Sequence, residues 1–180
     1  MGKRWAHIGI EEEDSFEEIF FSSSANRIIV QVSRNGDPLR LESLFVRSPT
    51  ERNYERLTPR SENLSYSDPV LPASAPFVFI NVWKKTKMKG DMVGGDWIGL
   101  SSINLETREL KQIADEKRLA EALQCERAWV SRILNASIDG NTIYCSIAMD
   151  TANKIGYWLC TLSLSDGSIS KVSELTDTFL

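Results

Sequence analysis

The sequence predicts an all-β fold of three consecutive four-stranded antiparallel repeats with one short helix. A similar succession of short apolar segments and turn residues occurs three times along the 180 residues. In the third copy, apolar and polar residues alternate, which is typical of strands with one buried face. Two Asp-Gly pairs, at Asp139 and Asp166, supply tight turns there. A β-sandwich is the alternative arrangement of the same strands.

These repeats divide the chain into six segments. The expected segments are an N-terminal lead-in at 1–14, repeat one at 15–58, a linker at 59–69, repeat two at 70–113, a helical insertion at 114–128 and repeat three at 129–177. The linker is assigned because residues 58–72 are rich in Ser and Pro, a composition typical of surface connections.

Repeat one is expected to place strands at 18–23, 27–33, 39–47 and 54–57. Its best hairpin signal is Asn35-Gly36, because both residues tolerate the positive φ angles of a tight turn. The acidic run before repeat one, residues 11–14, is interpreted as a solvated lead-in segment. Its carboxylates are consecutive and lack the spacing of a calcium-binding loop.

Repeat two is expected to begin near Val70, with strands at 77–83, 97–105 and 109–113. A short amphipathic helix should follow at 115–124, where Leu119, Ala120 and Leu123 lie among charged residues.

Repeat three is expected to have strands at 130–138, 142–148, 157–164 and 169–175. If its central hairpin is centred between Ala152 and Asn153, the numbers of opposed residues sum to 305. This register brings three apolar pairs onto one face, namely Ile143 with Leu162, Cys145 with Cys160, and Ile147 with Trp158. A slip of one residue would destroy the pattern.

Residues 136–144, which contain Asp139-Gly140, and residues 157–167, which end in Asp166-Gly167, resemble a blade of the TolB-like, WD-type β-propeller repeats. In that family an Asp-Gly turn joins the first two strands, and a Gly-containing turn leads from the third strand to the outermost one. The resemblance implies a noncatalytic protein-interaction or scaffold module. An enzyme, or an accessory domain of a hydrolase with carboxylates in a propeller pocket, is the alternative.

Three blades cannot close a propeller, because closed rings have roughly four to eight. We therefore expect a protein partner or self-association, with a homodimer that completes a six-bladed ring as the first hypothesis. Capping by another protein and truncation of a longer propeller are the other possibilities. A net charge of −4 with both signs spread along the chain gives no reason to expect nucleic acid as a partner.

Two candidate contact sites stand out. Lys84, Lys85, Lys87 and Lys89 form the densest positive patch and could contact an anion, although a solvated loop is the simpler interpretation. Trp5 lies outside the repeats and is a candidate docking residue.

No catalytic, cofactor-binding or metal-binding residues are assigned. His7 is the only histidine, which disfavours a Ser-His-Asp or Cys-His mechanism, and no glycine-rich nucleotide motif occurs. The three cysteines are expected to be free thiols, because they form no metal-binding spacing. The expected register also makes Cys145 and Cys160 a candidate cross-strand disulfide, which a reducing cytosol disfavours. The apolar runs are too short to cross a bilayer and no secretion signal is apparent, so a cytoplasmic protein without a membrane partner is expected.

Overall fold

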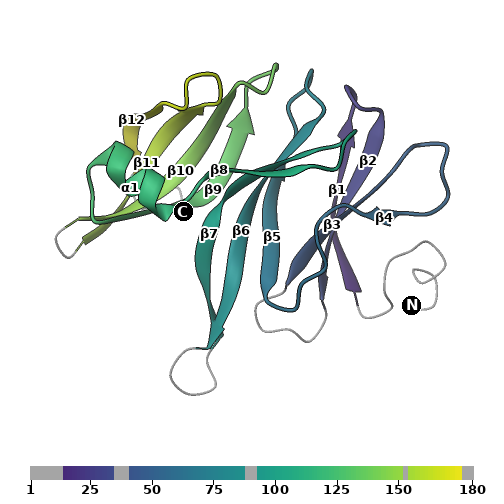
Figure 1. Cartoon of the computed structure of the whole chain (residues 1–180), viewed down its shortest axis with the longest axis horizontal. Coiled ribbons are helices and arrows are strands. Elements are labelled where there is room, and N and C mark those ends of the chain that lie inside the picture. Colours follow the sequence, from purple (N-terminus) through teal and green to yellow (C-terminus); the bar gives the residue numbers. More distant parts are fainter. Residues whose placement is uncertain (1–13, 35–40, 88–92, 152–153, 176–180) are drawn as a thin grey trace.

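The computed structural model of the chain consists of three antiparallel sheets and one short helix, and it describes residues 14–34, 41–87, 93–151 and 154–175 (Figure 1). Each sheet has four strands that neighbour one another in chain order: β1 to β4, β5 to β8 and β9 to β12. Antiparallel strands can be joined by tight turns, so each sheet forms from one continuous stretch of chain. The three sheets follow one another across the molecule (Figure 1).

In the first sheet, the strands are β1 (Asp14–Ser22), β2 (Arg27–Arg34), β3 (Glu42–Arg47) and β4 (Glu55–Arg56). All four overlap the segments expected from the sequence. Both faces of β2 are buried, because Ile29 packs toward the second sheet while Val30 packs with Phe45 on the opposite face. The turn expected at Asn35-Gly36 lies outside the described residues.

In the second sheet, the strands are β5 (Leu64–Val70), β6 (Phe77–Lys87), β7 (Val93–Asn104) and β8 (Leu110–Ala114). Strand β6 is apolar on both faces because each face packs against another sheet. Val78 and Ile80 pack with the first sheet, whereas Phe79 packs with the third. A strand buried on both faces shows a continuous apolar run instead of alternation, as residues 77–80 do.

Strand β5 corrects one expectation. The segment 59–69, expected to be a surface linker, contains most of this strand, and Ser65 and Tyr66 in it are buried. The register between β5 and β6 shifts between Ser67 and Val70, so the strand accommodates Pro69 at a bulge. Its polar composition resembles that of a loop, which is why the sequence did not indicate a strand.

Helix α1 (Glu116–Leu123) confirms the expected helix between the second and third sheets. The Asp115 side chain accepts a hydrogen bond of 2.8 Å from the backbone N–H of Arg118 and caps the first turn. Gln124 ends the helix in the left-handed conformation, with φ of 55°. The buried face carries Leu119 and Leu123, which pack between the two sheets.

In the third sheet, the strands are β9 (Arg127–Ala136), β10 (Thr142–Thr151), β11 (Lys154–Ser163) and β12 (Ile169–Leu175). The expected register is confirmed, because Ile143 lies opposite Leu162, Cys145 opposite Cys160, and Ile147 opposite Trp158. Both cysteines are buried free thiols. The Asp-Gly turns use glycine at positive φ, 73° at Gly140 and 74° at Gly167.

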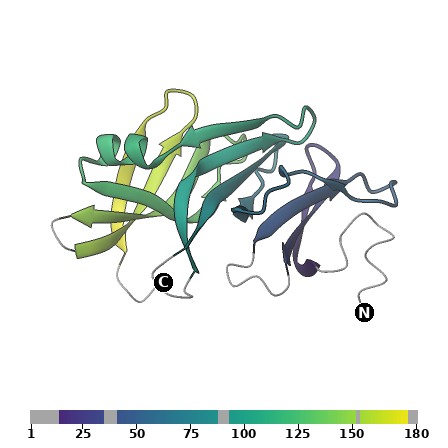
Figure 2. The ribbon, with the colours of Figure 1, turned by 60° about the horizontal axis from the view of Figure 1, so that its bottom comes forward.

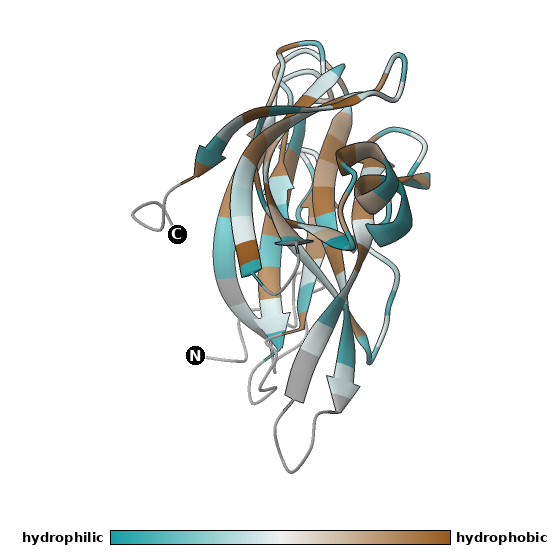
Figure 3. Cartoon of the chain, turned by 90° about the vertical axis from the view of Figure 1, so that its left-hand side faces the viewer, coloured by the Kyte–Doolittle hydropathy of each residue, from teal (hydrophilic) through white to brown (hydrophobic). Residues whose placement is uncertain are grey.

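Two hydrophobic clusters hold the sheets together, one at each boundary. The cluster between the first and second sheets includes Leu44, Tyr66 and Val82. The cluster between the second and third sheets includes Phe79, Leu119 and Ile147, so α1 contributes to it directly. Figure 2 shows the same order of sheets from another side, and Figure 3 shows hydrophobic and hydrophilic bands along the strands. Three successive packed sheets are the arrangement of consecutive propeller blades, and a two-sheet sandwich does not describe it.

In the part of the chain that the structure describes, no helix has both the length and the apolar character needed to cross a membrane.

Candidate functional site

A pocket of about 290 Å³ opens beside β1, β5 and β9, the first strands of the three sheets. We call it the inner pocket. Its walls are mostly polar and come from all three blades, with additional residues from β2 and β3. The lining residues are Glu18, Phe20, Gln31, Glu42, Ser67, Asp68, Pro69, Val70, Arg132 and Ile133.

Asp68 sits in this pocket with an unusual backbone. Its φ of 51° lies in the left-handed region, at the bulge of β5. Such a conformation is uncommon outside glycine, and aspartate and asparagine tolerate it best among the other residues. Asp68 Oδ2 accepts hydrogen bonds from Asn81 Nδ2 at 3.0 Å and from Ser67 Oγ at 3.3 Å. These contacts fix the direction of the carboxylate.

Asn81 is fully buried and links the inner pocket to the hydrophobic core. Its Oδ1 atom accepts a hydrogen bond of 3.2 Å from Trp97 Nε1, while its Nδ2 atom donates to Asp68. An indole N–H can only donate and an ionised carboxylate can only accept, so the orientation of the Asn81 amide is fixed by its two neighbours. The chain Trp97–Asn81–Asp68 therefore positions Asp68 from within the core.

Gln31 is a buried polar residue that lines this pocket. It is 7% exposed and lies directly opposite Glu18 across β1 and β2. No hydrogen bond of its side-chain amide to another described residue is found, and the amide atoms are not sealed in the core but are reached from the pocket. Its amide group is therefore available to a ligand in the pocket.

The charged groups of the inner pocket give it a negative balance. Glu18, Glu42 and Asp68 contribute three carboxylates, and Arg132 contributes one guanidinium. Within the described residues no group of three or more His, Cys, Asp or Glu side chains is close enough to hold a metal ion.

A second opening, of about 620 Å³, lies between the second and third sheets and is lined by Trp83, Trp97 and Trp129. Trp83 lies opposite Trp97 on the neighbouring strand. At its rim Arg127 Nε donates a hydrogen bond of 2.8 Å to Glu116 Oε1, and this bond raises the pKa of Arg127. Trp97 belongs to the core cluster of this boundary, and Trp83 and Trp129 pack against it.

The lysine patch is placed differently from the sequence expectation. Lys84, Lys85 and Lys87 belong to strand β6 and not to a loop, and Lys84 lies opposite Asp96 on β7. The alternation of a strand sends successive side chains to opposite faces, so the three lysines do not form one surface. Lys89 and Trp5 lie outside the described residues.

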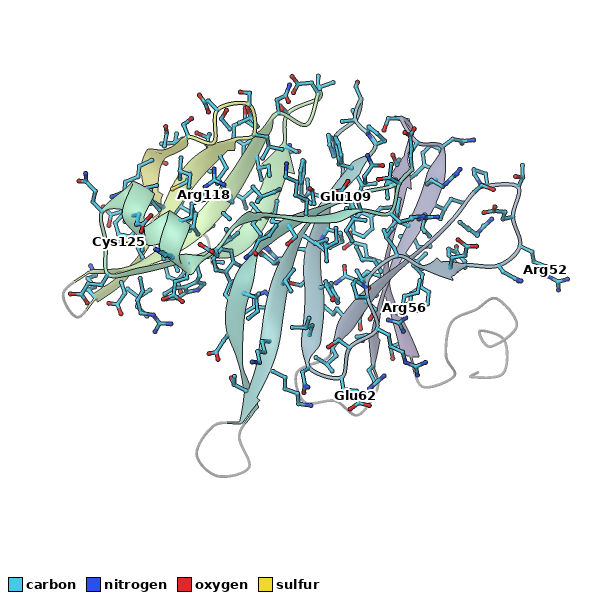
Figure 4. All side chains as sticks on the ribbon, in the orientation of Figure 1. Arg52, Arg56, Glu62, Glu109, Arg118 and Cys125 are labelled. Carbon is cyan, nitrogen blue, oxygen red and sulfur yellow. The ribbon has the colours of Figure 1, made fainter. Side chains whose placement is uncertain are left out.

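The face of the first sheet that points away from the second sheet is a candidate interaction surface. Cross-strand pairing places Ile19, Val30 and Phe45 in one row across β1, β2 and β3. Ile19 is 62% exposed and Phe21 is 59% exposed. The Arg56 guanidinium lies over the Phe45 ring, 4.6 Å from its centroid (Figure 4 labels Arg56). We call this surface the open face of the first sheet.

The third sheet also exposes apolar residues on the face that points away from the second sheet. Tyr144 is 38% exposed and Ile155 is 51% exposed. Between them lies Ser146, whose buried Oγ has no hydrogen-bond partner among the described residues. Both outer blades therefore present apolar residues on the side where a further blade would pack, whereas the middle blade is covered on both sides.

Comparison with known proteins supports the fold. The chain is similar in structure to an oligogalacturonate lyase in complex with manganese, with a TM-score of 0.59 and 11% identity over 89% of this chain. It is also similar to prolyl oligopeptidase B from Galerina marginata, with a TM-score of 0.53 and 12% identity over 94% of this chain. The chain spans 36% of the lyase and 24% of the peptidase.

No model of a protein family and no curated protein matches this sequence. The structural neighbours establish an all-β fold with propeller-like blades and do not identify the chemistry, because sequence identities are low.

The sequence did not single out Asp68 or Gln31. Asp68 falls in the segment that was expected to be a linker, and Gln31 occupies one position in an otherwise apolar strand, Ile28 to Val32. A glutamine within such a run was the available signal, since a buried amide needs a partner.

Proposed function

We propose that this chain is a noncatalytic protein-interaction module that associates by packing one propeller blade on another. The observation that carries the proposal is the open face of the first sheet, where Ile19 and Phe21 are more than half exposed. Exposed apolar residues on adjacent strands favour an interface, because burying them removes apolar surface from water. The resemblance of the third repeat to TolB-like blades supports an interaction module.

The partner that we propose is a second copy of this chain. In a two-fold dimer, the open face of the first sheet of one copy would pack on the third sheet of the other, and the reverse contact would form on the opposite side. Three blades from each copy give a six-bladed ring, within the range of roughly four to eight for closed propellers. This arrangement covers Ile19 and Phe21 in one copy with Tyr144 and Ile155 of the second.

Size-exclusion chromatography with light scattering, over a hundredfold range of concentration, tests the proposal. We expect a molar mass of twice 20.3 kDa for the unaltered chain. Phe21→Glu should shift the equilibrium to the monomer, since it places a charge in the interface. Leu110→Glu is the matched control, because Leu110 is 39% exposed on β8, away from both end faces, and should leave the dimer intact. A monomer at every concentration would contradict the dimer, and a stable heterologous complex would favour capping by another protein.

An enzyme with carboxylates in a propeller pocket is the second candidate function. The inner pocket supports it, because Glu18, Glu42 and Asp68 line one small cavity and paired carboxylates can serve as acid and base in glycoside hydrolysis. Turnover of aryl glycosides by the unaltered chain, abolished in Asp68→Asn, would favour this candidate. Turnover that survives Asp68→Asn, or no turnover, would remove it.

A further inference from the structure

Two features of the inner pocket indicate a ligand. Gln31 is 7% exposed, borders the pocket and has no hydrogen bond from its side-chain amide to another described residue. Its amide atoms are not sealed in the core, so a ligand in the pocket can pair with them. Asp68 holds a left-handed backbone at the same pocket. Residues in such sparsely populated conformations concentrate at binding and active sites.

The charge of the pocket selects the chemistry of that ligand. Three carboxylates face one guanidinium, so the balance is negative. Among the described residues no ion pair joins Glu18, Asp68 or Arg132 to another side chain. In the described part of the chain, no group of three or more His, Cys, Asp or Glu side chains could hold a metal ion. An ammonium group suits such a site, because its three N–H donors can reach separate acceptors.

We infer that the inner pocket binds a small molecule through a primary ammonium group. The Asp68 carboxylate, held in place by Asn81, is the anchoring acceptor, and the Gln31 side-chain carbonyl and Glu18 accept the remaining N–H donors. Arg132, on β9, supplies a positive charge on another wall of the pocket. It would oppose the second ammonium of a diamine and would attract the carboxylate of an amino acid. This site is independent of the dimer interface, since none of its residues belongs to the exposed apolar set.

Isothermal titration calorimetry with three probes of similar length tests the inference. The probes are 1,4-diaminobutane, 4-aminobutanoic acid and the uncharged 1,4-butanediol. We expect at least one amine to bind at least about tenfold more tightly than the diol, because hydrogen bonds to charged groups are the stronger ones. Asp68→Asn should weaken the binding of that amine by about tenfold. This variant keeps the fold, because asparagine also tolerates the left-handed backbone and can still accept from Asn81.

Arg132→Gln then distinguishes the two kinds of ammonium ligand. The variant should weaken the binding of 4-aminobutanoic acid and strengthen that of the diamine. Glu121→Gln is the control, because Glu121 is exposed on α1 and does not line the pocket, so it should change neither affinity. The inference is overturned if neither amine binds, if the diol binds as tightly as the amines, or if Asp68→Asn binds amines as well as the unaltered chain does. Thermal unfolding of each variant confirms that it is folded.

Discussion

Apolar side chains are buried in different ways at the boundary between the second and third sheets and on the open face of the first sheet. At the boundary, both sheets and α1 bury a continuous cluster that contains Phe79, Leu119 and Ile147. On the open face, Val30, Val32 and Phe45 form a small cluster against which, among the described residues, Ile28 and Tyr54 pack, and the Arg56 guanidinium lies over the Phe45 ring. Packing of one blade on another thus buries large side chains completely, whereas a single blade must use arginine stems and rings to cover its own face.

The largest expected effect is a difference in reactivity between the cysteines buried at the boundary of the second and third sheets and the partly exposed Cys125. Burial raises the pKa of Cys145 strongly and that of Cys160 to about 11, so almost no thiolate is present near neutral pH. Cys125 is only half-buried. Under native conditions a thiol reagent should modify Cys125 at least about a thousandfold faster than the other two, which require global opening. Mass spectrometry of the labelled peptides measures this, and comparable rates would mean that the boundary opens easily.

Removal of a large side chain from the same boundary should be costly. Leu119→Ala should lower the free energy of unfolding by about 2–5 kcal/mol, because it leaves a cavity beneath α1. Denaturant unfolding followed by circular dichroism measures the loss. Glu121→Ala, on the exposed side of the same helix, should change the stability by less than about 0.5 kcal/mol. Equal losses in both variants would show that α1 is not part of the core.

Acid should weaken the turns of the third sheet. Hydrogen bonds from Ser137 and Asn141 lower the pKa of Asp139 from 3.8 to about 2, and bonds from Ser163 and Ser168 do the same for Asp166. Because these pKa values are lower in the folded state, the stabilisation is present above about pH 4 and is lost as the pH falls toward 2. Between about pH 4 and pH 2, the free energy of unfolding of Asp139→Asn should fall less than that of the unaltered chain. Denaturant unfolding at several pH values measures this, and an equal fall in both proteins would contradict the prediction.

The smallest effect is expected on the open face. Arg56→Gln removes the contact of the guanidinium with the Phe45 ring and its hydrogen bond of 2.8 Å to Ser43 Oγ, and should lower the free energy of unfolding by about 1 kcal/mol. Arg52→Gln is a suitable control, since Arg52 is exposed on the neighbouring loop (Figure 4) and has no such contact with an aromatic ring of the described residues. Chemical denaturation at low protein concentration compares the two. A loss as large as that of Leu119→Ala would remove the distinction between the open face and the closed boundary.

The third sheet was predictable because its turns use glycine where the backbone needs positive φ. Gly167 has φ of 74°, and in the corresponding turn of the second sheet Arg108 has φ of 66° without being glycine. The hydrogen bonds from the backbone N–H groups of Glu106 and Thr107 to Asn104 Oδ1 stabilise that turn instead. A side-chain cap of this kind leaves a weaker signal in the sequence than Asp-Gly does.

The inner pocket was not predictable for a different reason. Its residues come from β1, β5 and β9, which are far apart in the sequence, and β5 owes its position to the buried Tyr66 and to the Asn81 contact of Asp68. Local pattern carries no information on such distant contacts, and polar strands resemble loops in composition. The helix, in contrast, was predictable because Asp115, Leu119 and Leu123 form a local signal.

The buried Asn81 amide offers a spectroscopic reporter. The indole proton of Trp97 is hydrogen bonded to the carbonyl end of this amide, while the amino end donates to Asp68. Polarisation passes along such a chain, so a change of charge at the carboxylate alters the strength of the distant bond. The resonance of the Trp97 indole proton in a proton–nitrogen NMR spectrum should therefore report when a charged group binds the Asp68 carboxylate, without any label at the pocket itself.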